Sequence, residues 1–346
     1  MRFIKQQLLG AALLCVASAS QAAGVLHFAN WSDYYPPQLL QKFEKDTGIK
    51  ATLDSYDGND TLTAKLKAGS GNYDVIVPSD SYIQILAKDG LLMKLDHSQL
   101  PNFKNVKAPF NAPSFDPKRD YTMPYMWGTT GFSYDTARVP GGKLPDSWKS
   151  LFEPIPELKG KIGMLDSEED VYMDAAWYLG LNECTENPED AKKILALLQK
   201  QKPSVATYNN DGTIERMIAG EVIMHEQWNG AYFRVKEKKP SVVYVYPKEG
   251  VRFWMDNFAI PSKAQNVKEA YIFINWMMQP ENIALASNFT KYNNAIAGSD
   301  KFMDAALFKD PAINTPQDMT SRFRPFKLCS PAALALRSKV WVKFKQ

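Results

Sequence analysis

Short apolar runs alternate with amphipathic segments along this chain, and that alternation restricts the possible folds more than any other feature. In the first stretch we expect strands at 25–29, 49–53 and 73–77, with one helix from Pro37 and another at 62–68. Three strands and two helices in about 55 residues are typical of βαβ units. The stretch therefore predicts an α/β sheet.

The same alternation returns in the second half of the chain. It predicts helices at 191–201, 213–219 and 267–278, and strands at 205–208, 222–224, 242–246 and 258–261. A length of 346 residues is enough for two domains, and neither an internal repeat nor a low-complexity tract interrupts the pattern. We therefore predict two α/β lobes.

The first 23 residues differ in composition from the rest of the chain. Arg2 and Lys5 precede an apolar stretch at 8–17, and small residues follow near Ala22. About ten apolar residues are too few to span a membrane, so we expect a cleaved secretory signal peptide at 1–23. An exported protein that diffuses freely needs an outer membrane to retain it, so the predicted location is the periplasm.

The cysteines and histidines predict neither a lipid anchor nor a metal site. The bulky Leu14 precedes Cys15, whereas a lipid-modified cysteine follows a small residue. The chain has no CxxC motif and its histidines are not spaced as metal ligands, so we expect no metal and no cofactor. Cys184 and Cys329 could pair in an oxidising compartment, but sequence alone does not decide whether they do.

The usual motifs of catalysis and of nucleic-acid binding are missing from the sequence. It has no GxSxG, GxGxxG or GxxxxGK[ST] motif. Lys+Arg 41 against Asp+Glu 38 gives a net charge of +3, and no dense basic block is present. These features favour a protein that is not an enzyme and does not bind nucleic acid.

Aromatic residues stand beside polar or acidic ones near predicted strands at 31–34 (WSDY), 228–230 (WNG) and 253–256 (FWMD), and a fourth, polar and acidic segment at 78–81 (PSDS) follows another predicted strand. The carboxyl ends of the strands are where open α/β sheets bind ligands. An aromatic face attracts an organic cation, and a carboxylate adds a charge-assisted hydrogen bond. The alternative at each place is a core tryptophan or an aspartate that caps a helix. Together they favour a ligand with ammonium groups and an alkyl middle.

The order and spacing of these motifs resemble the periplasmic polyamine-binding proteins of ABC importers, specifically the putrescine- and spermidine-binding subunits. The resemblance is carried by residues 30–34, 73–79, 123–127, 247–250 and 253–256, and it covers the whole mature chain. It implies a two-lobed periplasmic-binding-protein fold, similar to type II, with the ligand in a cleft between lobes joined by crossover hinge strands. We place the first lobe at 24–132 and 257–305, and the second at 133–256 and 306–346.

The resemblance also implies a set of ligand-binding residues. They are Trp31, Ser32, Asp33, Tyr34, Ser79, Ser81, Asp170, Trp228, Trp254, Asp256 and Tyr292. The tryptophans would cover the methylene groups, and the three aspartates would neutralise the ammonium groups. A closed, liganded monomer would then dock on the permease and ATPase subunits of other chains.

Two positions leave the identity of the ligand open. Ala231 stands where putrescine-specific relatives carry an aspartate, so that end of the cleft lacks one carboxylate. Arg252 shares strand parity with Trp254, and in the cleft it could bind the carboxylate of an ω-amino acid such as 4-aminobutyrate or 5-aminovalerate. We expect Arg252 on an exposed strand face instead, because arginines are mostly exposed. A sensory module that feeds a membrane receptor is the other alternative function.

Overall fold

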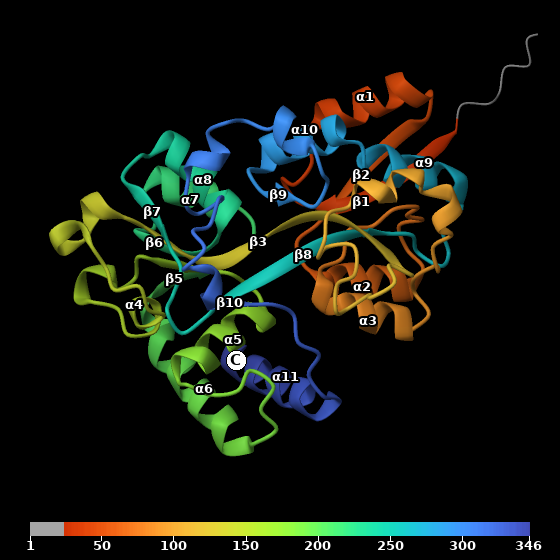
Figure 1. Ribbon diagram of the computed structural model, residues 1–346. Coiled ribbons are helices and arrows are strands. Elements are labelled where there is room, and N and C mark those ends of the chain that lie inside the picture. The colour runs from red at the N-terminus through yellow and green to blue at the C-terminus, as the bar shows by residue number, and fades with distance from the viewer. Residues whose placement is uncertain (1–23) are drawn as a thin grey trace, which may run out of the picture.

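The computed structural model describes residues 24–346 (Figure 1). Its α-helices are α1 (Pro37–Thr47), α2 (Asn59–Ala68), α3 (Asp80–Lys88), α4 (Lys149–Phe152), α5 (Glu168–Tyr178), α6 (Pro188–Gln201), α7 (Thr213–Ala219), α8 (Asn229–Lys238), α9 (Val267–Met277), α10 (Pro280–Thr290) and α11 (Pro331–Lys345). Its strands are β1 (Val25–Trp31), β2 (Lys50–Tyr56), β3 (Thr122–Asp135), β4 (Ile162–Met164), β5 (Val205–Tyr208), β6 (Met224–Trp228), β7 (Val242–Val245), β8 (Val251–Ala259), β9 (Asn293–Asn294) and β10 (Phe323–Arg324). The predicted signal peptide lies outside the described residues.

Local sequence signals account for several of these elements. α1 begins at Pro37, whose fixed φ suits the first helical position, and ends at Gly48, which adopts the left-handed φ of 74°. Ser167 caps α5 by accepting a hydrogen bond from the backbone N–H of Asp170. The predicted helices agree with α1, α2, α6, α7 and α9 to within a few residues, whereas α3, α8, α10, α11 and the long strand β3 were not predicted.

Two predicted strands differ from the structure. The run at 73–77 forms isolated bridges, from Val75 to Phe28 and from Ile76 to Ala259, instead of a regular strand. The run predicted at 258–261 is the end of a longer strand, β8, which begins at Val251. In both cases the pairing partners lie far away in the sequence, so the local pattern could not set the strand's length.

β3 and β8 connect the two lobes. The larger sheet has the order β10-β8-β3-β6-β4-β5, with β7 and β9 also paired to β3. β3 and β8 are antiparallel from the pair Thr122–Ala259 to the pair Thr130–Arg252. Figure 1 shows the two strands running side by side from one lobe into the other. This arrangement is the two-lobed α/β architecture with crossover strands that the sequence predicted.

Separate groups of buried apolar side chains show where each lobe packs. One core draws on residues 26–126 and 254–296 and includes Phe28 and Phe273. Another draws on residues 132–224 and on α11, and it includes Trp148 and Phe344. We call the body built from β1, β2, α1–α3, α9 and α10 the first lobe, and the body built from β4–β7, α4–α8 and α11 the second lobe.

A disulfide joins Cys184 to Cys329, whose Cα atoms are 5.1 Å apart. It connects the loop between α5 and α6 to the segment that precedes α11, and it answers the question that the sequence left open. Within residues 24–346, no helix is both long and apolar enough to cross a membrane. The same residues contain no group of three histidine, cysteine, aspartate or glutamate side chains arranged to hold a metal ion.

Candidate functional site

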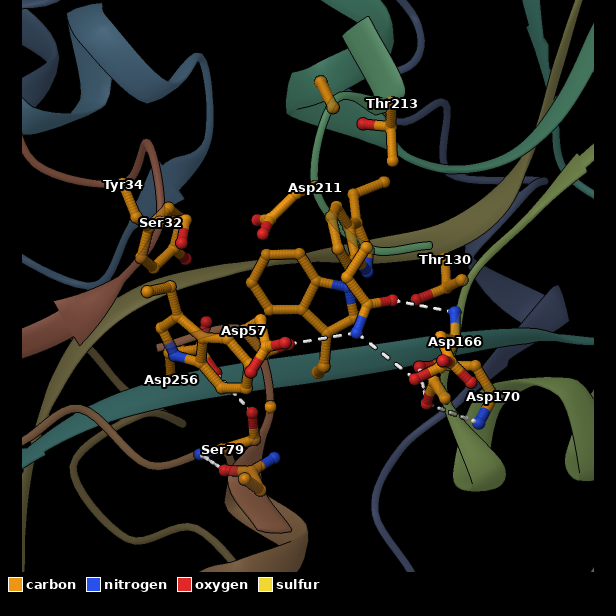
Figure 2. Close-up of a pocket in the computed structure, with 18 of the residues that line it drawn as sticks. Ser32, Tyr34, Asp57, Ser79, Thr130, Asp166, Asp170, Asp211, Thr213 and Asp256 are labelled. Atoms are coloured by element: carbon orange, nitrogen blue, oxygen red, sulfur yellow. Dashed lines mark hydrogen bonds between the residues drawn. The ribbon is translucent and has the colours of Figure 1, made fainter. Parts of the chain in front are cut away.

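A cavity of about 300 Å³ lies between the two lobes (Figure 2). Ten of the eleven residues predicted to bind a ligand line it: Trp31, Ser32, Asp33, Tyr34, Ser79, Asp170, Trp228, Trp254, Asp256 and Tyr292. The eleventh, Ser81, lines an adjacent cavity of about 280 Å³. The structure thus brings ten predicted side chains to one site, although they come from segments far apart in the chain.

Three aromatic rings and one carboxylate form one end of the cavity, which we call the aromatic end: Tyr34, Trp254, Tyr292 and Asp256. The ring of Tyr292 stands edge-on to Trp254 with centroids 5.1 Å apart, and to Tyr34 at 5.5 Å. The Ser79 hydroxyl donates a hydrogen bond of 2.7 Å to Asp256, and Figure 2 shows these two side chains together. A carboxylate beside aromatic faces is an environment that attracts an organic cation.

Asp256 is buried without a cation of its own chain. Its carboxylate forms no ion pair with any residue in the range 24–346. Burial raises the pKa of Asp256 to about 6, although the hydrogen bond from Ser79 favours the ionised form. A hydrogen bond from the Tyr34 hydroxyl and the charge of Arg252 also favour the ionised form of Asp256. The Trp254 indole N–H is buried and lacks a hydrogen-bond partner among the described residues. The aromatic end therefore holds polar groups that a bound ligand would satisfy.

Strand geometry explains how Trp254 and Asp256 come to face the cavity. Side chains alternate along β8, so Trp254 and Asp256 share one face of the strand. The register places Trp254 opposite Gly128 of β3. A Cβ atom at Gly128 would lie 2.6 Å from the Trp254 ring. The glycine therefore allows the indole to lie directly against β3.

The opposite end of the cavity is built around a guanidinium group, and we call it the arginine end: Asp80, Glu169, Asp170 and Arg252. Arg252 lies 3.1 Å from Asp80, 2.9 Å from Glu169 and 3.4 Å from Asp170. Its guanidinium also lies 3.3 Å from the Ser81 hydroxyl. Asp80 belongs to α3 in the first lobe and the other two carboxylates to α5 in the second, so this cluster bridges the lobes.

The prediction that Arg252 lies on an exposed strand face was wrong. Its side chain is 7% exposed and lines the cavity. Burial alone would lower the pKa of Arg252, but the charges of Glu169, Asp170 and Asp80 outweigh it and hold the pKa above its usual value. Burying an arginine costs much free energy when its charge is unpaired. Here three carboxylates from distant segments pair with the guanidinium, so the side chain can be buried.

The carboxylates at the arginine end are already supplied with hydrogen-bond donors. Both oxygens of Asp80 accept hydrogen bonds, from Arg252 and from two backbone amides. Asp170 accepts from Arg252 through one oxygen and from the Ser167 hydroxyl, at 2.7 Å, through the other. Burial raises the pKa of Asp80 to about 7, while the Arg252 charge opposes that rise. Burial also favours a higher pKa for Glu169, but the charge of Arg252 has the larger effect, so the pKa of Glu169 is lowered.

Polar contacts also link the two lobes across the opening of the cavity. Asp33 forms an ion pair with Arg234 of α8. The Asn210 side chain donates to the backbone carbonyl of Asp57 at 3.0 Å and to that of Asp166 at 3.3 Å. Asp33, predicted to neutralise a ligand ammonium, is thus paired with a cation of the chain itself. These contacts join the two lobes beside the cavity.

A second buried acidic group lies behind the arginine end. Asp174 of α5 and Glu226 of β6 are fully buried, and their carboxyl groups lie within hydrogen-bonding reach of each other. Burial and the neighbouring carboxylates raise the pKa of Glu226 to about 8 and the pKa of Asp174 well above its usual value. At neutral pH this pair therefore retains at least one proton.

The residues that line the cavity carry a strong excess of negative charge. Ten carboxylates line it: Asp33, Asp57, Asp60, Asp166, Glu168, Glu169, Asp170, Asp211, Glu215 and Asp256. Three arginines also line it, and each is paired with a carboxylate: Arg234, Arg252 and Arg337. A concave surface with this charge concentrates cations.

Comparison with known proteins places this geometry in a family. Residues 38–315 match the family described as bacterial extracellular solute-binding protein. The chain belongs to this family. It is 35% identical to the putrescine-binding periplasmic protein SpuD of Pseudomonas aeruginosa, with 95% of each chain covered. It is 36% identical to the spermidine/putrescine-binding periplasmic protein of Escherichia coli, with 89% of each covered.

Solved structures of the same family share the fold. A structure from Listeria monocytogenes, named for a spermidine/putrescine ABC transporter, has a TM-score of 0.88 and 30% identity, over 94% of this chain and 99% of that one. The spermidine/putrescine ABC transporter substrate-binding protein PotD of Streptococcus pneumoniae has a TM-score of 0.77 and 27% identity, over 93% and 99%. The two-lobed solute-binding fold predicted from the sequence is therefore confirmed.

Sequence reasoning missed the role of two residues at the arginine end. Asp80 stood inside the motif at 78–81 but was not selected, because an aspartate after a strand also caps a helix. Glu169 lies in the first turn of α5, where an acidic residue is favoured by the helix dipole alone. Only the position of Arg252 shows that both carboxylates pair with a buried cation.

Proposed function

We propose that this chain is the periplasmic solute-binding subunit of an ABC importer and that it captures a ligand of the polyamine class. The observation that supports this most strongly is Asp256, a buried carboxylate without a cation, set among the rings of Tyr34, Trp254 and Tyr292. The excess of carboxylates around the cavity favours the same class of ligand. The names of the relatives, which refer to putrescine and spermidine, add to this support.

In the proposed mechanism, an amine enters the open cleft and its ammonium group pairs with Asp256. Trp254 and Tyr292 cover the adjacent methylene groups, and Trp228 adds an aromatic face where β6 ends and α8 begins. The ligand favours the closed state because only that state offers contacts from both lobes. Trp31, whose indole N–H donates to the Val77 carbonyl, borders the site from the first lobe.

We further propose that the closed monomer delivers the ligand to permease and ATPase subunits of other chains and does not transform it. The division of the chain follows the same reasoning, with the first lobe at 24–132 and 257–305 and the second at 133–256 and 306–346. The predicted signal peptide and the periplasmic names of the relatives support export to the periplasm. The disulfide fits an oxidising compartment of this kind.

A thermal-shift panel on residues 24–346 tests the proposed ligand class. The ligands are putrescine, cadaverine, spermidine, spermine, 4-aminobutyrate and 5-aminovalerate. A ligand at about 1,000 times its Kd should stabilise the folded protein by roughly 4 kcal/mol. We expect stabilisation by at least one amine without a carboxylate. The same concentration of that amine should stabilise the variant Asp256→Asn much less, by about 1.4 kcal/mol if binding is about 100-fold weaker.

Two outcomes of the panel would contradict the proposal. Stabilisation by the ω-amino acids alone would show that the site binds a carboxylate group. The ligand would then belong to a different chemical class from the polyamines. No stabilisation by any ligand would leave the fold in place and remove the amine class. The contacts of Arg252 argue against the first outcome, because its guanidinium already pairs with three carboxylates of the chain.

A further inference from the structure

We infer that Arg252 is a built-in cation that occupies the place of a second ligand ammonium and so determines which amines this protein binds. The inference rests on the proposed function, since it concerns the ligand of the same cavity. It assigns the two ends of the cavity different tasks. The aromatic end binds one ammonium group of the ligand, and the arginine end is filled by the protein's own guanidinium.

The contacts that Arg252 makes are those expected of a bound ammonium group. Its guanidinium contacts Asp80, Glu169, Asp170 and the Ser81 hydroxyl at distances between 2.9 and 3.4 Å. Carboxylates and a hydroxyl are the same groups that would surround a bound ammonium. Two of these residues, Ser81 and Asp170, were expected from the sequence to bind the ligand. In the structure they bind Arg252.

The position of Arg252 relative to the aromatic end is set by β8. It stands two residues before Trp254 and four before Asp256 on β8, so all three share the face that lines the cavity. The register pairs Arg252 with Thr130, and Thr130 with Trp228 on the other side. Arg252 thus lines the same cavity as the aromatic end, and it also borders the adjacent cavity that Ser81 lines.

The charge of Arg252 also affects a ligand that enters the cavity. A second ammonium that reached the arginine end would face a fixed positive charge whose surrounding carboxylates already hold hydrogen bonds. A ligand carboxylate would also bind poorly at the arginine end, because the three acidic side chains that surround the guanidinium would repel it. The cavity therefore suits an amine that presents one ammonium to Asp256 and an uncharged segment of its chain toward Arg252.

A thermodynamic cycle tests this inference. Isothermal titration calorimetry measures the Kd of putrescine and of 1-aminobutane, which differ by one ammonium group, for the native protein and for Arg252→Leu. We expect the preference for putrescine over 1-aminobutane to rise at least tenfold in the variant, because the vacated carboxylates then accept the second ammonium. The preference for spermidine over 1-aminobutane should rise in Arg252→Leu by at least the same factor as the preference for putrescine.

A matched control separates this effect from a general change in charge. Arg337 is another arginine at the cavity, 13% exposed and paired with Glu168 at 3.2 Å. Arg337→Leu removes the same charge, and we expect it to change the putrescine preference less than threefold. An equal rise in both variants would show that the net charge of the cavity is responsible and would overturn the assignment of Arg252.

The remaining outcomes are also decisive. Because Arg252→Leu leaves three buried carboxylates without their cation, the double variant Arg252→Leu with Glu169→Gln keeps the charge balance if the single variant does not fold. An unchanged preference in the folded variant overturns the inference about Arg252 while the amine-binding function stands. Failure of every amine to bind both the native protein and the variant overturns the proposed function, and the inference falls with it.

Discussion

The two ends of the cavity contain similar buried carboxylates but neutralise them in different ways. At the aromatic end, Asp256 has a hydrogen bond from Ser79 and no cation within residues 24–346, and its pKa is raised to about 6. At the arginine end, Arg252 supplies the positive charge to Asp80, Glu169 and Asp170. The difference shows which carboxylate still needs a partner.

Electrostatic theory explains why this difference matters for binding. A buried carboxylate without a partner is costly, and a ligand that supplies the partner recovers that cost as affinity. A carboxylate that is already paired within the protein offers much less of this gain. We therefore expect the aromatic end to supply most of the electrostatic affinity for an amine.

The largest expected effect is the loss of the Asp256 charge. Asp256→Asn should weaken binding of the preferred amine about 100-fold, because removing one partner of a buried charge pair costs about 2–5 kcal/mol. Asp170→Asn, the matched change at the arginine end, should weaken binding less than about fivefold, and calorimetric Kd values measure both. Equal losses in the two variants would mean that both ends bind the ligand.

The next effect is on stability and concerns the acidic pair behind the arginine end. Glu226 has a folded-state pKa of about 8, above the unfolded value, so the folded protein keeps a proton that the unfolded chain loses. Stability from this group therefore falls as the pH rises from about 4.5 to 8. Glu226→Gln should stabilise the ligand-free protein by about 2 kcal/mol at pH 8.

Denaturant unfolding of the native protein and of Glu226→Gln at pH 5 and pH 8 measures this effect. At pH 5 the two proteins should differ little, because Glu226 is protonated in the folded state and the glutamine resembles that form. A variant that is equally destabilised at both pH values would show that the side chain contributes only by packing.

A smaller effect is the pH dependence of binding. Asp256 must be ionised to pair with an ammonium, and its pKa in the ligand-free protein is about 6. Affinity should therefore fall about tenfold between pH 7 and pH 5 as the carboxylate takes up a proton. Asp256→Asn should show no such fall. If it does, another group controls binding, and Asp80, whose pKa is raised to about 7, becomes the candidate.

The smallest effect is expected at the opening of the cavity, away from both ends. Arg234 pairs with Asp33 across the cleft, but half of the Asp33 side chain is exposed. Exposed ion pairs contribute about 0–1 kcal/mol, so Arg234→Gln should weaken binding less than about fivefold. The loss should shrink further at high salt. A larger loss would show that this contact determines closure of the lobes.

Much of the fold could be predicted from the sequence because its signals are local. The proline pair before α1, the glycine after it and the apolar runs of β1 and β2 each depend on neighbours within a few residues. The run at 73–77 shows the limit of this reasoning, since its partners are Phe28 and Ala259. A strand's extent depends on pairing, and pairing joins segments that are distant in the chain.

The sequence by itself determined that the chain is an α/β protein, and its resemblance to a known family implied ten of the residues that line the cavity between the lobes. Only the tertiary structure decided how their charges are shared. Arg252 is buried because Asp80 and Glu169, at least 83 positions away, approach it from two different helices. Asp33 likewise forms an ion pair with Arg234, which comes from a distant segment of the chain. Alternation along a strand sets the face on which a side chain lies, but ion pairing depends on distances between elements that no local pattern contains.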